Sequence, residues 1–128
     1  MDEMNFKELA QQYRSELLDR VLPFWLEKSQ DTEFGGYFSC LNRDGSVFDT
    51  DKFIWLQGRE VWMFAMLYNS LEKNPKWLEA AVQGAEFLKT SGHDGNYVFY
   101  FSVASSVHLY YVHVATLVCC YAVFADFA

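Results

Sequence analysis

Basic residues are scarce in this sequence, and their scarcity bears on the partners that it could bind. The 128 residues include 10 Lys and Arg against 17 Asp and Glu, which gives a formal net charge of −7. Proteins that bind DNA or RNA present a basic surface that neutralises the phosphates. The sequence therefore predicts no nucleic-acid partner.

Cysteine is scarce as well, and the cysteines form no recognisable framework. Cys40, Cys119 and Cys120 are odd in number, and residues adjacent in sequence rarely form an ordinary disulfide. They also lack the CxxC spacing and the histidine partners of a structural zinc site. The first 20 residues mix charged and apolar side chains, unlike a signal peptide. We therefore expect a cytoplasmic protein with reduced thiols and no structural metal.

The length leaves room for a single domain, and the composition predicts that it folds. Domains generally run to about 100–200 residues. Hydrophobic residues make up 52% of the chain, too many for a disordered segment. Aromatic residues make up 19%, and their flat faces can stack on sugars or fill a core. The composition permits a carbohydrate site without indicating one.

Charged residues almost vanish in the last part of the chain, where only Asp126 follows Asp94. The run 109–125 is nearly apolar, but it is shorter than the roughly 20 residues of a membrane-spanning helix and has no basic flank. We therefore expect no membrane span. We interpret residues 102–128 as a stretch translated in a wrong reading frame, which reading the encoding DNA in its other two frames would test.

Apolar periodicity predicts a mainly helical, all-α fold. Residues spaced by three and four predict helices at 5–22, 55–72 and 76–90. We expect Pro23 to end the first helix, and Asn74 with the proline after it to cap the start of the third. The short connection between the second and third helices predicts an antiparallel hairpin.

Short motifs follow one another through the first hundred residues. They are VLPFW at 21–25, GGYF at 35–38, WLQGR at 55–59 and GHDG at 92–95. The GGYF motif opens a β-like excursion predicted at 35–48, where an Asp-Gly turn separates two β-prone runs. This ordered series resembles the N-acylglucosamine 2-epimerase family over about residues 1–101.

The resemblance implies an (α/α)6 barrel built from helical hairpins. Residues 1–101 would be the N-terminal part of that barrel domain, and residues 102–128 an out-of-family tail. The implied activity is that of an isomerase, a sugar 2-epimerase that interconverts N-acylglucosamine and N-acylmannosamine. It removes and returns the C2 proton of the open-chain sugar through a planar enediolate, without a metal or other cofactor. The expected substrate is an N-acetylhexosamine or a related sugar, and the resemblance allows a homodimer of the full-length enzyme.

Arg59 is the one catalytic position that the resemblance carries over, because it ends the WLQGR motif. The family's arginine at this place points toward the C1 and C2 oxygens of the sugar. A guanidinium suits that role, since it keeps its charge and offers several donors in a rigid plane to a developing oxyanion. The alternative is an arginine that pairs with Glu60 or another carboxylate on the helix surface.

Three further side chains are candidate sugar contacts. Trp55 lies one helical turn before Arg59 and could stack on a sugar ring or pack in the core. Gln57 and Tyr37 could contact hydroxyl groups, or could be a surface amide and an aromatic packed on the helices. The aromatic residues predicted to be core are Trp62, Phe64, Trp77 and Phe87.

The histidines of this chain are not expected to act as acid and base. His93 precedes an Asp-Gly turn, and His108 and His113 lie where the motifs have ended. In the family, two histidines beyond the matched region are thought to transfer the protons, so we expect the 128-residue chain to be inactive alone. A second hypothesis stays open: a small non-catalytic helical protein whose C-terminal segment associates with a membrane or a partner.

Overall fold

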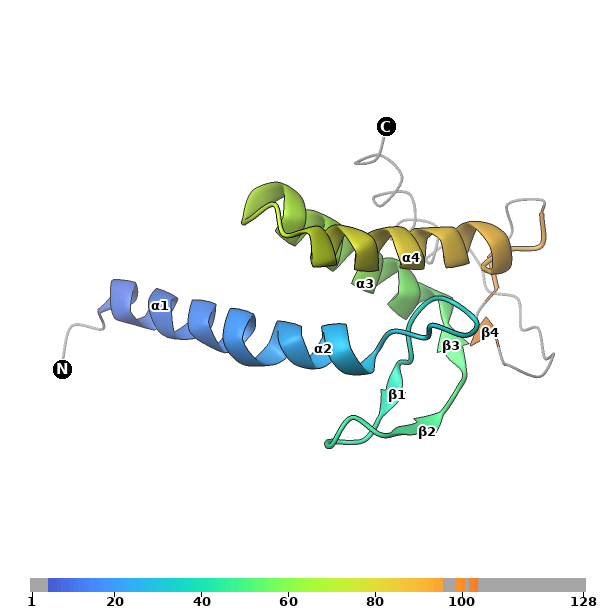
Figure 1. Ribbon diagram of the computed structural model, residues 1–128, viewed down its shortest axis with the longest axis horizontal. Helices are drawn as coiled ribbons and strands as arrows, with labels where there is room; N and C mark the ends of the chain where they lie inside the picture. Colours follow the sequence, from blue (N-terminus) through green and yellow to red (C-terminus); the bar gives the residue numbers. More distant parts are fainter. Residues whose placement is uncertain (1–4, 96–98, 101, 104–128) are drawn as a thin grey trace.

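Helices dominate the computed structural model, which describes residues 5–95, 99–100 and 102–103 (Figure 1). The predicted, mainly helical fold class is thereby confirmed. No helix within these residues is both long and apolar enough to cross a membrane. The predictions for His108, His113 and all but the first two residues of the 102–128 tail concern residues outside the described part of the chain.

A long helical rod forms the N-terminal part of the chain (Figure 1). It consists of α1 (Phe6–Glu16), a π-helical turn (Leu17–Val21) and α2 (Leu22–Lys28). The prediction that Pro23 ends this helix is wrong. Proline lacks the N–H of a helical hydrogen bond and clashes with the carbonyl one turn earlier. Just before Pro23, the π-helical turn shifts the hydrogen bonds by one residue, so that the Leu22 N–H donates to the Leu17 carbonyl. The helix therefore continues past Pro23.

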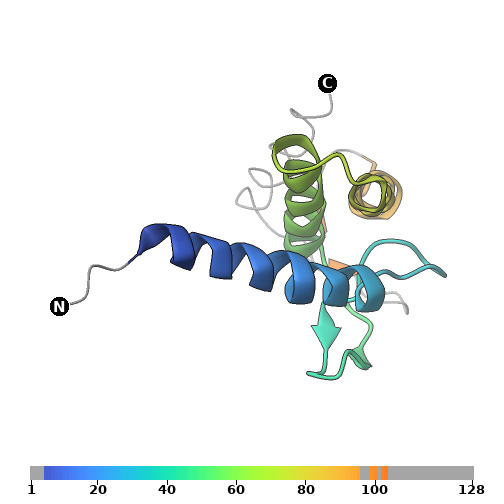
Figure 2. The same cartoon turned by 60° about the vertical axis from the view of Figure 1, so that its left-hand side comes forward.

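Two antiparallel helices, α3 (Ile54–Ser70) and α4 (Pro75–Ser91), pack side by side across the rod (Figures 1 and 2). Both confirm the helices predicted at 55–72 and 76–90, and residues 71–74 join them in the predicted hairpin. Asn74 caps α4 as expected, because its side chain accepts the Lys76 N–H at 3.1 Å.

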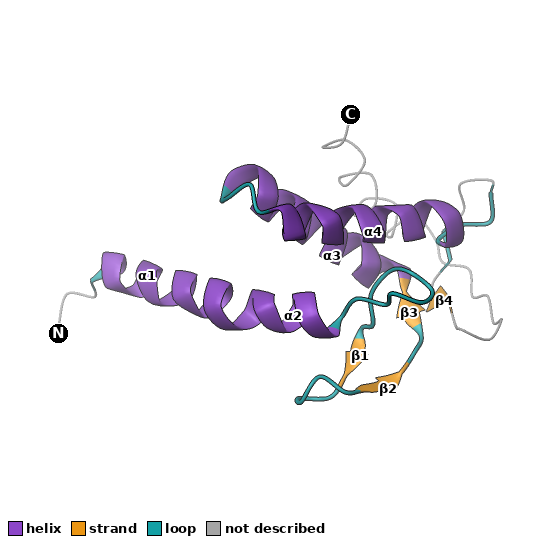
Figure 3. Cartoon of the chain, viewed as in Figure 1, coloured by secondary structure: helices purple, strands orange, loops and turns teal. Residues whose placement is uncertain are grey.

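Four short strands accompany the helices (Figure 3). β1 (Cys40–Leu41) pairs antiparallel with β2 (Val47–Asp49), and β3 (Lys52–Phe53) pairs antiparallel with β4 (Ser102–Val103). The first pair confirms the predicted excursion, and its turn uses Gly45 at φ +86°, a conformation that glycine adopts readily. The second pair was not predicted, because it joins segments far apart in the sequence.

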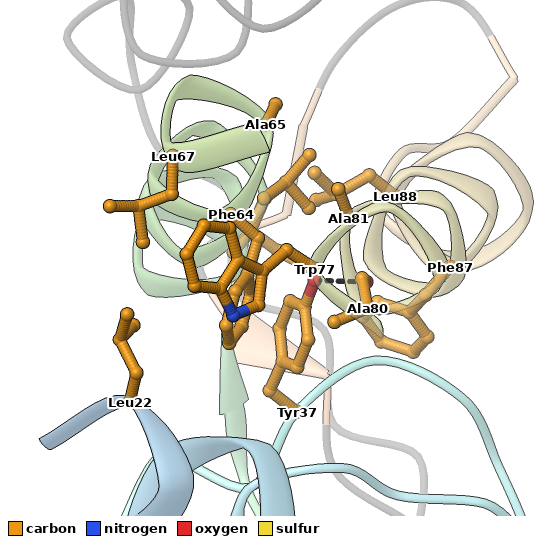
Figure 4. Close-up of a cluster of buried hydrophobic side chains, with 12 residues drawn as sticks. Leu22, Tyr37, Phe64, Ala65, Leu67, Trp77, Ala80, Ala81, Phe87 and Leu88 are labelled. Atoms are coloured by element: carbon orange, nitrogen blue, oxygen red, sulfur yellow. Dashed lines mark hydrogen bonds between the residues drawn. The ribbon is translucent and has the colours of Figure 1, made fainter. Parts of the chain in front are cut away.

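Buried side chains of α3, α4 and the loop before β1 meet in one core (Figure 4). Phe64, Trp77 and Phe87 belong to it, as predicted. The prediction that Trp62 is a core residue is wrong, because its side chain is 40% exposed. Trp62 follows Arg59 by three residues and therefore shares the exposed face of α3.

Tyr37 ties the loop before β1 to α4. Its ring is fully buried, and its hydroxyl donates to the Ala80 carbonyl at 2.6 Å (Figure 4). Gly84, one turn after Ala80, makes this approach possible, because a Cβ at that position would overlap the Tyr37 ring and hydroxyl. The loop that carries the GGYF motif is thus held against the helical hairpin.

Candidate functional site

A mainly apolar groove of about 200 Å³ lies between the N-terminal rod and α3. We call it the Arg59 groove; it is lined by Val21, Trp25, Ser39, Leu56, Arg59, Glu60 and Met63. Its two charged residues are adjacent in the sequence: Arg59 ends the WLQGR motif, and Glu60 follows it. A groove of this kind, with a few polar groups in an apolar wall, is typical of a small-molecule site.

Arg59 is exposed on α3 and forms no ion pair with the other residues that the structure describes. The alternative of a surface pair with Glu60 is therefore not observed. Glu60 bonds instead to the Ser29 hydroxyl at 2.6 Å. The guanidinium of Arg59 consequently keeps its donors available for an anionic or hydroxyl-rich ligand.

Trp55 lies on the same exposed face of α3, one turn before Arg59, and its side chain is 42% exposed. Trp62 lies on this face too, about one turn after Arg59. The exposed face of α3 therefore places a guanidinium between two indoles. Indole faces stack on the apolar side of sugar rings, and a guanidinium binds their oxygens.

Gln57 and Tyr37 do not fit the prediction that they contact sugar hydroxyls, because both side chains are 0% exposed. The Gln57 side-chain oxygen accepts the Tyr37 N–H at 2.7 Å, and its amide donates to the Tyr37 carbonyl at 2.8 Å. A sugar has no access to either side chain in this arrangement. Helical spacing could have indicated this burial, since Gln57 lies between Ile54 and Val61 on the apolar face of α3.

Replacing Gln57 by Glu should destabilise the chain by about 2 kcal/mol or more at neutral pH. An ionised glutamate can accept the Tyr37 N–H but cannot donate to the Tyr37 carbonyl, and it also introduces a buried charge. Urea unfolding of the purified chain measures the effect. Gln11→Glu, at an exposed site on α1, is the matched control and should change stability little. Equal stability of Q57E and Q11E would contradict the structural role of Gln57.

Lys52, in β3 just before α3, is a buried cation that sequence reasoning did not single out as a site residue. Its ammonium donates to Asp31 at 2.5 Å and to the Gly35 carbonyl at 2.7 Å. It also lies 5.4 Å from the centre of the Phe38 ring and 5.1 Å from that of Phe87. Because its donors serve the GGYF loop, we interpret Lys52 as the residue that positions this loop against α4.

Asp31 completes this buried ion pair, and its side chain also accepts the N–H groups of Glu33 and Phe34 at 2.9 and 3.0 Å. Burial alone would raise the pKa of the Asp31 carboxyl. The hydrogen bonds from Lys52 and from the two backbone N–H groups outweigh burial and lower the pKa below its usual value of 3.8. Asp31 is therefore ionised in the folded chain at neutral pH.

Glu60 differs from Asp31 in having no cation beside it. Burial raises the pKa of the Glu60 carboxyl to about 7, although the hydrogen bond with Ser29 acts in the opposite direction. The sequence suggested Glu60 only as a surface partner of Arg59. Its burial depends on residues far from it in the sequence, Trp25 and Ser29, so no local pattern reveals it.

His93 lies in the turn after α4, where its Nδ1 accepts the Gly95 N–H at 3.0 Å. It is not among the residues that line the Arg59 groove, none of which belongs to α4 or to the turn after it. Within the described ranges, no group of three His, Cys, Asp or Glu residues could hold a metal ion.

Comparison with known proteins gives sugar 2-epimerases among the relatives of this chain. The bovine (Bos taurus) N-acylglucosamine 2-epimerase is 55% identical over 73 residues, which cover 56% of this chain and 17% of that enzyme. The solved cellobiose 2-epimerase of Spirochaeta thermophila has a TM-score of 0.69 and 29% identity, over 77% of this chain and 24% of its own. The solved cellobiose 2-epimerase of Bacillus thermoamylovorans has a TM-score of 0.68 and 30% identity, over 76% of this chain and 25% of its own.

This chain therefore spans only about a sixth to a quarter of the length of these relatives. The pattern of the family described as N-acylglucosamine 2-epimerase (GlcNAc 2-epimerase) matches residues 36–128. The matched range runs past residue 101, where the resemblance recognised in the sequence ends. Because the match covers well over half of the residues, the chain belongs to the N-acylglucosamine 2-epimerase family.

Proposed function

We propose that this chain is the Arg59-bearing part of a sugar 2-epimerase that acts on an N-acylated hexosamine. The observation that supports it best is the position of Arg59, which is exposed at the wall of a groove with Trp55 on the same face of α3. The higher identity to N-acylglucosamine 2-epimerases, 52–55%, than to cellobiose 2-epimerases, 28–34%, favours the N-acyl sugar.

The proposed reaction removes the proton from C2 of the open-chain sugar and returns a proton to the opposite face. Negative charge then moves onto the C1 oxygen and must be stabilised while the carbon is planar. Arg59 supplies that stabilisation in our proposal, because its guanidinium remains charged and never competes for the transferred proton. Trp55 would hold the apolar face of the sugar.

The remaining parts of the machinery lie outside the described residues in this proposal. The helices of this chain would be the opening hairpins of an (α/α)6 barrel, and the acid and base would come from later helices. The 128-residue chain would therefore be inactive alone. The cytoplasmic location and the homodimer of the full-length enzyme stay predictions.

Hydrogen exchange at C2 tests the proposed function. A full-length protein that carries this segment should convert N-acetylglucosamine to N-acetylmannosamine and, in D2O, place deuterium at C2 of the product. The 128-residue chain should show neither, because positioned acid and base groups each contribute about a hundred- to ten-thousand-fold. NMR of the sugars measures both events, with cellobiose as the comparison substrate. No exchange by the full-length protein on either sugar would refute the proposal.

A further inference from the structure

The Arg59 groove has one property that the proposed reaction does not use, a wall that is mainly apolar. The apolar side chains come from the N-terminal rod and from α3: Val21, Trp25, Leu56 and Met63. Arg59 belongs both to this groove and to the exposed face of α3 that carries Trp55. A ligand bound by Arg59 can therefore contact two surfaces, the exposed indole and the apolar groove.

The size of the groove suits one substituent of a sugar better than a whole sugar. Its volume is about 200 Å³. Pockets that enclose a complete small ligand usually have roughly 300–1,000 Å³. An apolar cavity of about 150 Å³ holds a benzene molecule. A short acyl group, from formyl to butanoyl, therefore has room in the groove.

The proposed reaction brings the C2 substituent of the sugar next to Arg59. In the planar enolate the charged oxygen is on C1, and the nitrogen that carries the acyl group is on the adjacent carbon, C2. When the guanidinium binds the C1 oxygen, the acyl group starts beside the groove, because Arg59 is part of its wall.

Two polar side chains of the groove match an amide. Glu60 Oε1 accepts the Ser29 hydroxyl at 2.6 Å, and the second oxygen of the carboxyl group can accept the N–H of an N-acyl group. The Oγ of Ser39 is buried and forms no hydrogen bond with the residues that the structure describes. Buried hydroxyl groups normally have a partner. An acyl carbonyl in the groove would supply one once Ser39 turns to another staggered rotamer.

We propose that the Arg59 groove is the subsite for the N-acyl group of the sugar, with its apolar wall around the acyl chain and with Glu60 and Ser39 beside the amide. This inference rests on the sugar 2-epimerase function proposed above and places a part of the substrate that the function leaves unplaced. An acyl chain gains free energy by leaving water, whereas a hydroxyl group at C2, as in cellobiose, needs no apolar groove. The groove thereby favours N-acylated sugars.

A series of acyl groups tests the subsite in a full-length protein that carries this segment. N-formyl-, N-acetyl- and N-butanoylglucosamine differ only in the part that enters the groove. Wild type should epimerise the N-butanoyl sugar with a kcat/KM at least equal to that of the N-formyl sugar, because the added carbons are buried. A kcat/KM lower by about tenfold or more would overturn the inference, since the acyl chain would then meet no such space.

Filling the groove should reverse this preference. Val21→Trp adds an indole at a wall position whose side chain is 43% exposed, so the protein should still fold. Its kcat/KM for the N-butanoyl sugar should fall by about tenfold or more relative to that for the N-formyl sugar. Val82→Trp is the matched control, at a 45% exposed site on α4 that does not line the groove, and should keep the wild-type ratio.

The outcomes separate this inference from the proposed function. An unchanged ratio in V21W, with turnover of the N-formyl sugar, would overturn the subsite and leave the epimerase function standing. No turnover of any of these sugars by wild type would overturn the function and the subsite together. The wild-type series needs no substitution, so it decides the question even if V21W fails to fold.

Discussion

Alanine at position 59 is expected to lower kcat by about a hundredfold or more in a full-length epimerase that carries this segment. The reason is that Arg59 is proposed to bind the enolate, with its charge on the C1 oxygen, more strongly than the sugar, so its loss affects the transition state most. KM should therefore rise much less than kcat falls. The fold should survive, because the Arg59 side chain is exposed and holds no described partner in the core. Steady-state kinetics and thermal unfolding measure the two effects.

Matched variants separate this role from a general effect of charge. Arg59→Lys keeps the positive charge but loses the planar fork of donors, so its kcat should lie between those of wild type and alanine. Arg43→Ala removes an exposed arginine from the turn between β1 and β2 and should leave kcat unchanged. An R59A enzyme with normal kcat and reduced thermal stability would show that Arg59 is structural.

Lys52→Met should cost about 3–5 kcal/mol of stability in the 128-residue chain, because it strands the Asp31 charge in the core. Lys52 and Asp31 have side chains only 6% and 4% exposed. Arg20→Met is the matched control, since it breaks the Arg20–Glu16 pair whose side chains are 74% and 49% exposed. Surface pairs of this kind contribute about 0–1 kcal/mol. Urea unfolding at neutral pH compares the variants.

The same ion pair also predicts an acid-labile component of stability. The pKa of Asp31 is lowered on folding, so its stabilisation is present above about pH 3.8 and is lost as the pH falls through the folded pKa. Lys52→Met should reduce this acid sensitivity along with stability. If K52M were no less stable than R20M at neutral pH, the buried pair would not hold the GGYF loop.

Local sequence patterns were sufficient for the helical hairpin. The periodicity of 55–72 and 76–90, and the cap formed by Asn74, act between residues a few positions apart, so they can be identified without the fold. The turn at Gly45 is local in the same sense. The family was also recognisable from the sequence, because the WLQGR motif and the GGYF motif each occupy a few consecutive positions.

Prediction failed where a neighbouring helix decides the environment of a side chain. A proline usually ends a helix, but the π-helical turn before Pro23 lets this helix continue. Trp62 is hydrophobic and was expected in the core, yet its side chain is 40% exposed on α3. Gln57 is polar and was expected to contact sugar hydroxyls or to be a surface amide, yet it forms two hydrogen bonds with the backbone of Tyr37 in the core.

The sequence by itself determined the hairpin of α3 and α4, the Asn74 cap, the family and the candidate role of Arg59, since all of these depend on residue type at short spacing. Only the tertiary structure decided the pairing of Lys52 with Asp31 and the burial of Glu60 against Ser29. These pairs join positions 21 and 31 residues apart. The charge state of a carboxyl group depends on burial and on partners within hydrogen-bond distance, and packing across the chain sets both.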